Sequence, residues 1–154
     1  MTVTVTDVRA HLDPEEPDYA SAALLGPAAL PVLDELVRGD APLLAAKATY
    51  LASLIPGEQQ PSVLAAAATS AEPTVRVAAA AGLRNLAESD AGELADNLLV
   101  DADLGVRKQA LQSVASFTTP AMTERLRRVA DADPEAILRN VAAESLQRFS
   151  RGES

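Results

Sequence analysis

The chain has 154 residues, no cysteine and a formal net charge of −9, and 48% of its residues are hydrophobic whereas only 3% are aromatic. This length allows one domain with a core of ordinary size, and the lack of cysteine excludes a disulfide framework and a thiolate metal site. No run approaches the 18 uninterrupted apolar residues of a membrane span, and the N-terminus lacks the basic start and apolar run of a signal peptide. We therefore predict a single domain over 1–154, located in the cytoplasm.

The first 25 residues are predicted to form an N-terminal helical cap. A short helix is expected over 5–12, and a truncated helix over 17–25. Between them, DPEEPD at 13–18 has two prolines and four acids, which fits a turn better than the interior of a helix. These elements differ from the rest of the chain, as the end unit of a repeat array must.

Two alternating sets of helices follow the cap. The shorter A helices are predicted over 26–39, 61–70, 90–101 and 119–132, and the B helices over 42–55, 74–88, 104–117 and 136–150. Prolines stand where the first turn tolerates them, at Pro27, Pro61 and Pro120, and Gly39 is a C-terminal stop signal. We therefore predict four repeats, over about 26–55, 61–88, 90–117 and 119–150.

The B helices align with one another at spacings of 31 or 32 residues. The first aligned position of each helix, from which the register is counted, is Leu43, Val75, Val106 or Leu138. Residues 4, 8 and 11 positions further on share one helical face, which is predicted to face the core. An acid stands three residues before each start, where a helix N-terminus favours negative charge and a capping side chain: Asp40, Glu72, Asp103 and Glu135.

Segments 101–117 and 131–149 share a further pattern, an acid followed about five positions on by an apolar residue and arginine, and then by Ala and Leu at helical spacing; segment 72–86 has all of it but the acid. Asp101 precedes Val106 and Arg107 in this way, and Asp133 precedes Leu138 and Arg139. The pattern resembles the HEAT-repeat signature, including the bacterial lyase-type subgroup. Over about 26–150, the resemblance implies an all-α fold, an α-α superhelix (HEAT/armadillo-like solenoid) of about four helix pairs behind the cap. The second repeat departs from the pattern with Ser70 in place of the acid, and the first lacks the pair, with Arg38 and Leu44.

Catalytic chemistry finds little support in the residues. His11 is the only histidine, so neither a transition-metal site nor a nucleophile with a histidine base is expected, and no glycine-rich phosphate loop is present. Arg76, Arg107 and Arg139 recur at equivalent places, and we expect them to pair with an acid of the same or a neighbouring repeat and to satisfy the turn between helices. The sequence therefore predicts no enzyme, no cofactor and no metal.

The remaining candidate site is a surface. The residues 2, 6 and 9 positions after each start point away from the predicted core and are expected on the concave side, which B helices line in solenoids that this chain resembles. Small side chains there permit close approach of a protein or peptide. Together with Tyr50, these rows supply the candidate partner-binding residues Ala45, Thr49, Ala52, Val77, Ala81, Arg84, Lys108 and Gln112; the remaining members are Ala115, Asn140, Glu144 and Gln147.

Two alternatives to a protein-binding scaffold stay open. One is nucleic-acid binding by the C-terminal half, through Arg107, Lys108, Arg125, Arg127, Arg128 and Arg139. Residues 104–154 carry eight basic residues against six acids, a balance of +2, but residues 1–40 carry −6, and the acidity of the whole chain argues against this role. The other is an accessory or regulatory subunit of an enzyme complex. Neither the partner nor the oligomeric state follows from the sequence.

Overall fold

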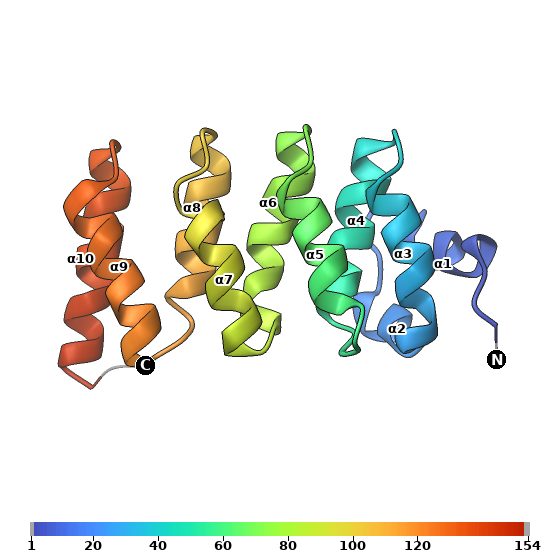
Figure 1. Ribbon diagram of the computed structural model, residues 1–154, viewed down its shortest axis with the longest axis horizontal. Coiled ribbons are helices and arrows are strands. Elements are labelled where there is room, and N and C mark those ends of the chain that lie inside the picture. Colours follow the sequence, from blue (N-terminus) through green and yellow to red (C-terminus); the bar gives the residue numbers. More distant parts are fainter. Residues whose placement is uncertain (1, 153–154) are drawn as a thin grey trace.

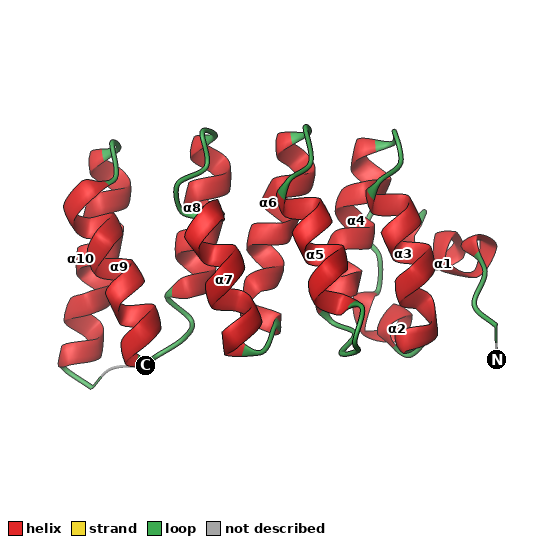
Figure 2. Ribbon diagram, in the orientation of Figure 1, coloured by secondary structure: helices red, strands yellow, loops and turns green. Residues whose placement is uncertain are grey.

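The computed structural model describes residues 2–152 as two layers of helices in a row (Figure 1). This part of the chain contains no strand (Figure 2). Its elements are α1 (Val5–Leu12), α2 (Tyr19–Ala23), η1 (Pro27–Ala29), α3 (Leu30–Val37), α4 (Pro42–Ser53), α5 (Gln60–Ala68), α6 (Pro73–Gly82), η2 (Leu83–Asn85), α7 (Glu88–Leu98), α8 (Leu104–Val114), α9 (Pro120–Ala132) and α10 (Ala136–Ser150). The all-α fold class and its solenoid of four helix pairs behind an N-terminal cap are confirmed, with α3, α5, α7 and α9 as A helices and α4, α6, α8 and α10 as B helices.

Most helices begin where the sequence supplies a start signal. Pro42, Pro73 and Pro120 occupy the first positions of α4, α6 and α9, where the missing proline N–H is not needed for an intrahelical bond. In the cap, Thr4 and Asp7 form a reciprocal capping box at the start of α1. Of the four acids expected to cap B helices, only Asp103 accepts a hydrogen bond with its side chain, from the Val106 amide.

The first three B helices pack closely because small residues line their contacts. A Cβ placed on Gly82 of α6 would lie 2.6 Å from the Ser53 Cβ of α4. On the opposite side of α6, the Ser113 hydroxyl of α8 donates to the Ala80 carbonyl at 2.7 Å. Helix backbones can approach to this degree only where side chains are small. The B helices contact one another more extensively than the A helices do, as far as α8.

The predicted register of the first B helix is wrong by one residue. Helices α4, α6 and α8 begin 31 residues apart, so α4 is equivalent to its neighbours from Leu44, and Leu43 is 73% exposed. The predicted concave residues Ala45, Thr49 and Ala52 are consequently buried, with exposures of 1%, 0% and 0%. Two adjacent leucines made both registers fit the apolar period, and packing chose the second.

The predicted register places Lys47 toward the core. In the structure, Lys47 instead joins the N-terminal cap to the first helix pair. Its ammonium donates to the backbone carbonyls of Leu12 and Pro14, at 3.0 and 2.9 Å. These bonds satisfy the C-terminal end of α1 and the turn that follows it. The cap is therefore held to α4 by hydrogen bonds as well as by its buried residues Val8 and Leu12.

The fourth helix pair stands apart from the third. Helices α9 and α10 pack along each other, but α10 contacts α8 much less than α8 contacts α6, and Figure 1 shows the wider spacing. Val77 and Ala81 of α6 are half-buried, whereas Lys108 and Gln112, at the equivalent positions of α8, are exposed. No helix within residues 2–152 combines the length and apolar character that a membrane crossing needs.

Candidate functional site

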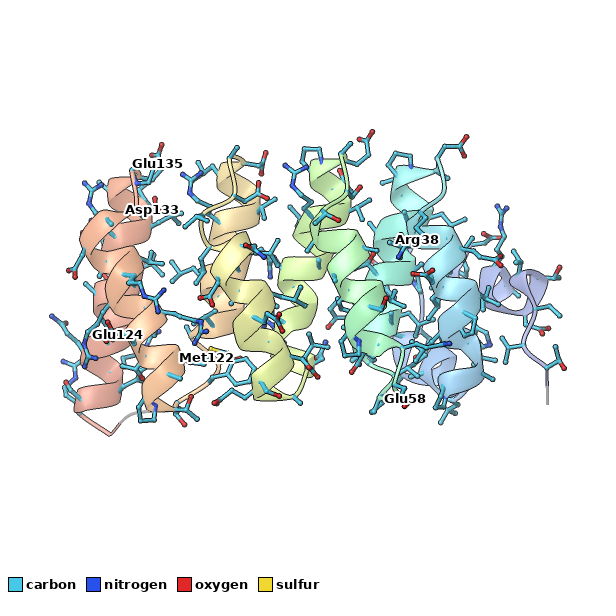
Figure 3. The ribbon with its side chains drawn as sticks, viewed as in Figure 1. Arg38, Glu58, Met122, Glu124, Asp133 and Glu135 are labelled. Atoms are coloured by element: carbon cyan, nitrogen blue, oxygen red, sulfur yellow. The ribbon has the colours of Figure 1, made fainter. Side chains whose placement is uncertain are left out.

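An arginine ladder links the turns that lead into the B helices. The Arg76 Nε lies 2.9 Å from the Asp101 Oδ2, and the Arg107 Nε lies 3.2 Å from the Asp133 Oδ2. Each ladder arginine also donates to a backbone carbonyl six residues earlier; Arg139 uses that of Asp133. The expectation that these arginines pair with acids and satisfy turns is confirmed for Arg76 and Arg107, and the partner carboxylate comes from the next repeat. Figure 3 shows Asp133 at the edge where these turns lie.

The Arg107–Asp133 pair is buried and the Arg76–Asp101 pair is half-buried. Side-chain exposure is 17% for Arg76 and 12% for Asp101, and only 10% for Arg107 and 2% for Asp133. Burial raises the pKa of Asp101, but the hydrogen bonds from Arg76 and from the Asp103 amide, together with the charges of Arg76 and Arg107, outweigh it and leave that pKa below its usual value. The ladder is thus a structural network that joins consecutive repeats.

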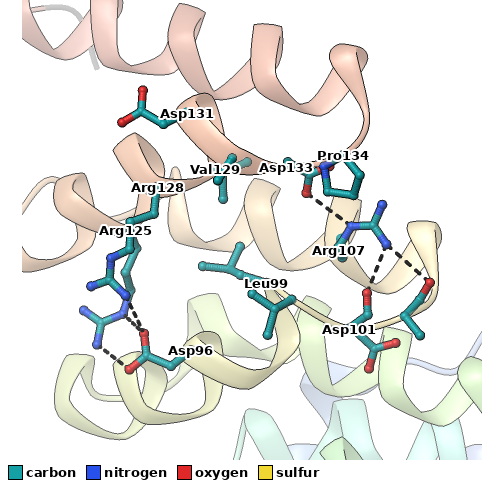
Figure 4. A pocket seen from close by; sticks show the side chains of 13 residues that line it. Asp96, Leu99, Asp101, Arg107, Arg125, Arg128, Val129, Asp131, Asp133 and Pro134 are labelled. Atoms are coloured by element: carbon teal, nitrogen blue, oxygen red, sulfur yellow. Dashed lines mark hydrogen bonds and ion pairs between the residues drawn. The ribbon is translucent and has the colours of Figure 1, made fainter.

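A groove of about 650 Å³ lies between the third and fourth helix pairs (Figure 4). Leu99, at the end of α7, and Val129, on α9, form its apolar floor, and Val100, Ala132 and Pro134 add apolar surface around it. The wider spacing of the fourth pair leaves this space open. Val100 is 77% exposed and extends the apolar surface beside this floor.

Ion pairs close both ends of the groove. At one end stands the Arg107–Asp133 pair of the ladder, and at the other the guanidinium of Arg125 binds Asp96 with both Nε and Nη2, at 2.9 and 3.0 Å (Figure 4). The Arg125 side chain lies against α7 at Gly92, where a Cβ would come within 3.2 Å of Nη2. The Arg128 Nη1 lies 3.8 Å from the Oδ1 of the same Asp96, a longer contact than that of Arg125, and the Arg128 side chain is 63% exposed. Arg128 is therefore the rim cation most available to a ligand.

The groove is lined by apolar and charged side chains. Its polar side chains are arginines and aspartates, most of them held in the pairs just described, and none is a serine, cysteine or histidine that could act as nucleophile or as a base near neutral pH. Within residues 2–152, no three His, Cys, Asp or Glu side chains are grouped as a metal site requires.

The sequence-predicted site residues lie on the B-helix layer and not in the groove. Ala45, Thr49 and Ala52 are in the core, so their predicted exposure is wrong. Tyr50, Val77 and Ala81 are half-buried, and Tyr50 packs edge-on against Tyr19, with ring centroids 5.0 Å apart. Arg84, Lys108 and Gln112 are exposed, as are Asn140, Glu144 and Gln147, while Ala115 is half-buried.

Sequence reasoning missed the groove, although one signal was present. Leu98, Leu99 and Val100 form an apolar run that is one residue too long for the buried face of α7, and Val100 is the residue left outside. Nothing in the sequence indicated that a groove would open beside Val100.

Several basic residues of the C-terminal half are engaged by acids or carbonyls. Arg107 and Arg125 form the ion pairs described above, Arg127 lies 3.2 Å from the Glu124 carboxylate, and Arg139 donates to a carbonyl. Paired guanidinium groups neutralise few phosphates, so this arrangement weakens the case for nucleic-acid binding.

The sequence model for HEAT repeats matches residues 61–147, which is more than half of the chain and reaches from α5 into α10. The first helix pair and the cap lie outside the match. No curated protein matches the sequence.

Proposed function

Because the chain belongs to the HEAT-repeat family, whose repeats generally mediate protein–protein interaction, we propose that it is a non-enzymatic scaffold that binds a protein or peptide in the groove between the third and fourth helix pairs. The observation that carries the proposal is the apolar lining of the groove, in which Val100 is 77% exposed beside Leu99 and Val129, whose exposures are 7% and 6%. The composition is compatible with a reducing cytosol, which is where we place the protein.

Apolar surface of this kind favours an interface. Covering Val100 and the groove floor removes apolar area from water, and each Å² of this area contributes about 25 cal/mol of favourable burial free energy. The ion pairs at the two ends limit the length of the segment that fits between them, and they are already satisfied, so a ligand does not have to replace their hydrogen bonds. A partner is expected to insert one or two apolar side chains between α7 and α9.

The exposed Arg128 at the groove rim indicates which charge the partner should carry. Arg128 is exposed and only weakly paired, so a carboxylate of the partner beside its apolar anchor would complement it. The exposed residues of the B-helix layer, Arg84, Lys108 and Gln112, offer a second surface, which we propose as an extension of the interface when the partner is larger than a peptide.

The test compares proteins captured from a lysate of the native cell by the immobilised full chain and by four variants. Ala132→Glu fills the groove and Val100→Glu places charge on its wall, so both should lose the captured partner. Arg128→Glu should weaken capture, and Arg127→Glu, one residue away on α9 with the same charge change but outside the groove, should retain it. Circular dichroism melting of each variant controls for folding.

Equal recovery of the same proteins by Ala132→Glu and Arg127→Glu would refute the groove as the binding site. An enzyme among the specifically lost proteins would favour the accessory-subunit alternative. For nucleic acid, a titration of labelled single-stranded and duplex DNA and RNA decides: binding that falls steeply with salt and is lost in Lys108→Glu would favour that alternative over a protein partner.

A further inference from the structure

Each rung of the arginine ladder is an ion pair between an arginine and an aspartate of the next repeat. Between the first and second helix pairs this rung is missing, because both the arginine and the aspartate are replaced by other residues. Ala45 is the fourth residue of α4, the position that Arg76 holds in α6 and Arg107 in α8. Its partner should be the residue equivalent to Asp101, two positions before the N-cap of the next B helix, and that residue is Ser70. The rung between the first and second helix pairs therefore consists of alanine and serine.

The backbone around the missing rung keeps the form that it has at the complete rungs. The Ser70 hydroxyl accepts a hydrogen bond from the Glu72 amide at 3.1 Å, as Asp101 accepts one from the Asp103 amide at 2.9 Å. Serine thus preserves the turn and lacks only the second oxygen that binds a guanidinium. What differs at this rung is the absent side chain.

A notch of about 440 Å³ opens at this place, between the turns that precede α4 and α6. Ala45 lies at its base, and Gly39, Asp40, Ser70 and Glu72 are among the residues around it. The Gly39 carbonyl is equivalent to the Ser70 carbonyl, which accepts a hydrogen bond from Arg76 at 2.9 Å, and no such bond to Gly39 is found within residues 2–152.

Charge around the notch is negative. Asp40 and Glu72 are exposed and form no ion pair in the described part of the chain. Arg38 also borders the notch, but its guanidinium binds Asp34, with the Nε 3.0 and 3.1 Å from the two carboxylate oxygens. Asp40, Glu72, Gly39 and Ser70 therefore line a space in which the next two repeats each hold an arginine.

We propose that this notch binds the guanidinium of an arginine side chain presented by a partner protein, which completes the missing rung. The precedent lies within this molecule, where the equivalent carbonyls of Ser70 and Asp101 accept hydrogen bonds from Arg76 and Arg107. A planar guanidinium donates to the Gly39 carbonyl and to an acid at once, which a lysine ammonium does less well. The notch lies on the first two helix pairs, away from the groove of the proposed function, so the two sites can be tested independently and the failure of one leaves the other unaffected.

The direct test is an NMR titration of the isotope-labelled full chain with N-acetyl-arginine amide. Amide signals of Gly39, Asp40, Ser70, Ala71 and Glu72 should shift together and saturate, with a Kd on the order of millimolar for so small a ligand. N-acetyl-citrulline amide, which has nearly the same shape without the charge, should bind at least about ten-fold more weakly. Equal shifts with citrulline, or shifts spread over the surface, would overturn the proposal.

Variants separate the notch from other acidic surface. The double variant Ala45→Arg, Ser70→Asp rebuilds the rung from the chain itself and should abolish the titration. Asp40→Asn with Glu72→Gln should weaken binding at least about three-fold without filling the notch, which covers the case in which the rebuilt rung does not fold. Glu58→Gln is the matched control at the opposite edge of the solenoid (Figure 3) and should leave binding unchanged. Unchanged binding in Asp40→Asn, Glu72→Gln would refute the site.

Discussion

Replacing Arg107 by methionine should destabilise the fold by about 3 kcal/mol, far more than removing an exposed arginine. The substitution keeps most of the apolar stem and deletes the guanidinium. It leaves the Asp133 carboxylate, only 2% exposed, with the Glu135 amide at 2.8 Å as its remaining donor. It also frees the carbonyls of Asp101 and Ala102, which the Arg107 Nη1 binds at 3.0 and 3.3 Å.

The magnitude follows from the geometry of this pair. At an effective dielectric constant of about 20, unit charges 3.2 Å apart attract by roughly 5 kcal/mol, and part of this offsets the cost of taking both charges out of water. Breaking one side of a buried pair typically costs about 3–5 kcal/mol, because the other charge stays buried and unpaired. For a chain of this length, 3 kcal/mol lowers Tm by about 6–12 °C.

Urea and thermal unfolding followed by circular dichroism measure the effect, with Asp133→Asn and the double variant completing a thermodynamic cycle. The coupling energy between the two positions should exceed about 1 kcal/mol. Arg38→Met is the matched control, because its ion pair with Asp34 is exposed and should be worth less than about 1 kcal/mol. If Arg107→Met costs no more than Arg38→Met, the ladder does not stabilise the solenoid as argued.

Further expectations concern the close helix contact, the caps and pH. Gly82→Ala should destabilise by about 1–3 kcal/mol in chemical denaturation despite alanine's better helix propensity, because its Cβ would meet Ser53, and Ser53→Gly should recover most of the loss. Asp103→Ala should cost about 1 kcal/mol, whereas Glu135→Ala, at an N-cap without a side-chain bond, should cost clearly less; equal costs would refute the capping argument. Because the pKa of Asp101 is lowered in the folded state, its contribution to stability is complete above the unfolded pKa of about 3.9 and is lost as pH falls through the folded value. The difference in unfolding free energy between wild type and Asp101→Asn should therefore shrink from pH 7 towards pH 2; a difference that grows would contradict this expectation.

The helices and most of their buried faces could be read from the sequence, because both depend on local chemistry. Prolines mark the starts of α4, α6 and α9, and the apolar period places Val75 and Val106 in the core, as observed. The residue types also indicated that the recurring arginines pair with acids. Which acid each one binds was not readable, since Arg76 and Asp101 belong to different repeats.

The candidate site was much less predictable. Ala45 and Thr49 were expected on the surface because Leu43 and Leu44 fit the period equally well, and only packing against the neighbouring helices put Leu44 in register. The groove beside Val100 had no sequence counterpart beyond an apolar run that was slightly too long. Its width depends on the whole contact between α8 and α10 and not on any one residue.

By itself, the sequence determined that this chain forms paired helices, where most of them begin, and which residues could bear charge at the turns. Those properties repeat within one helix, where neighbours three or four positions apart meet whatever the rest of the fold does. Only the tertiary structure decided the register of α4, the partners in the ladder and the two openings, at the groove and at the notch. Each of these is set by side chains that meet from different repeats, at distances and rotations that no local period encodes.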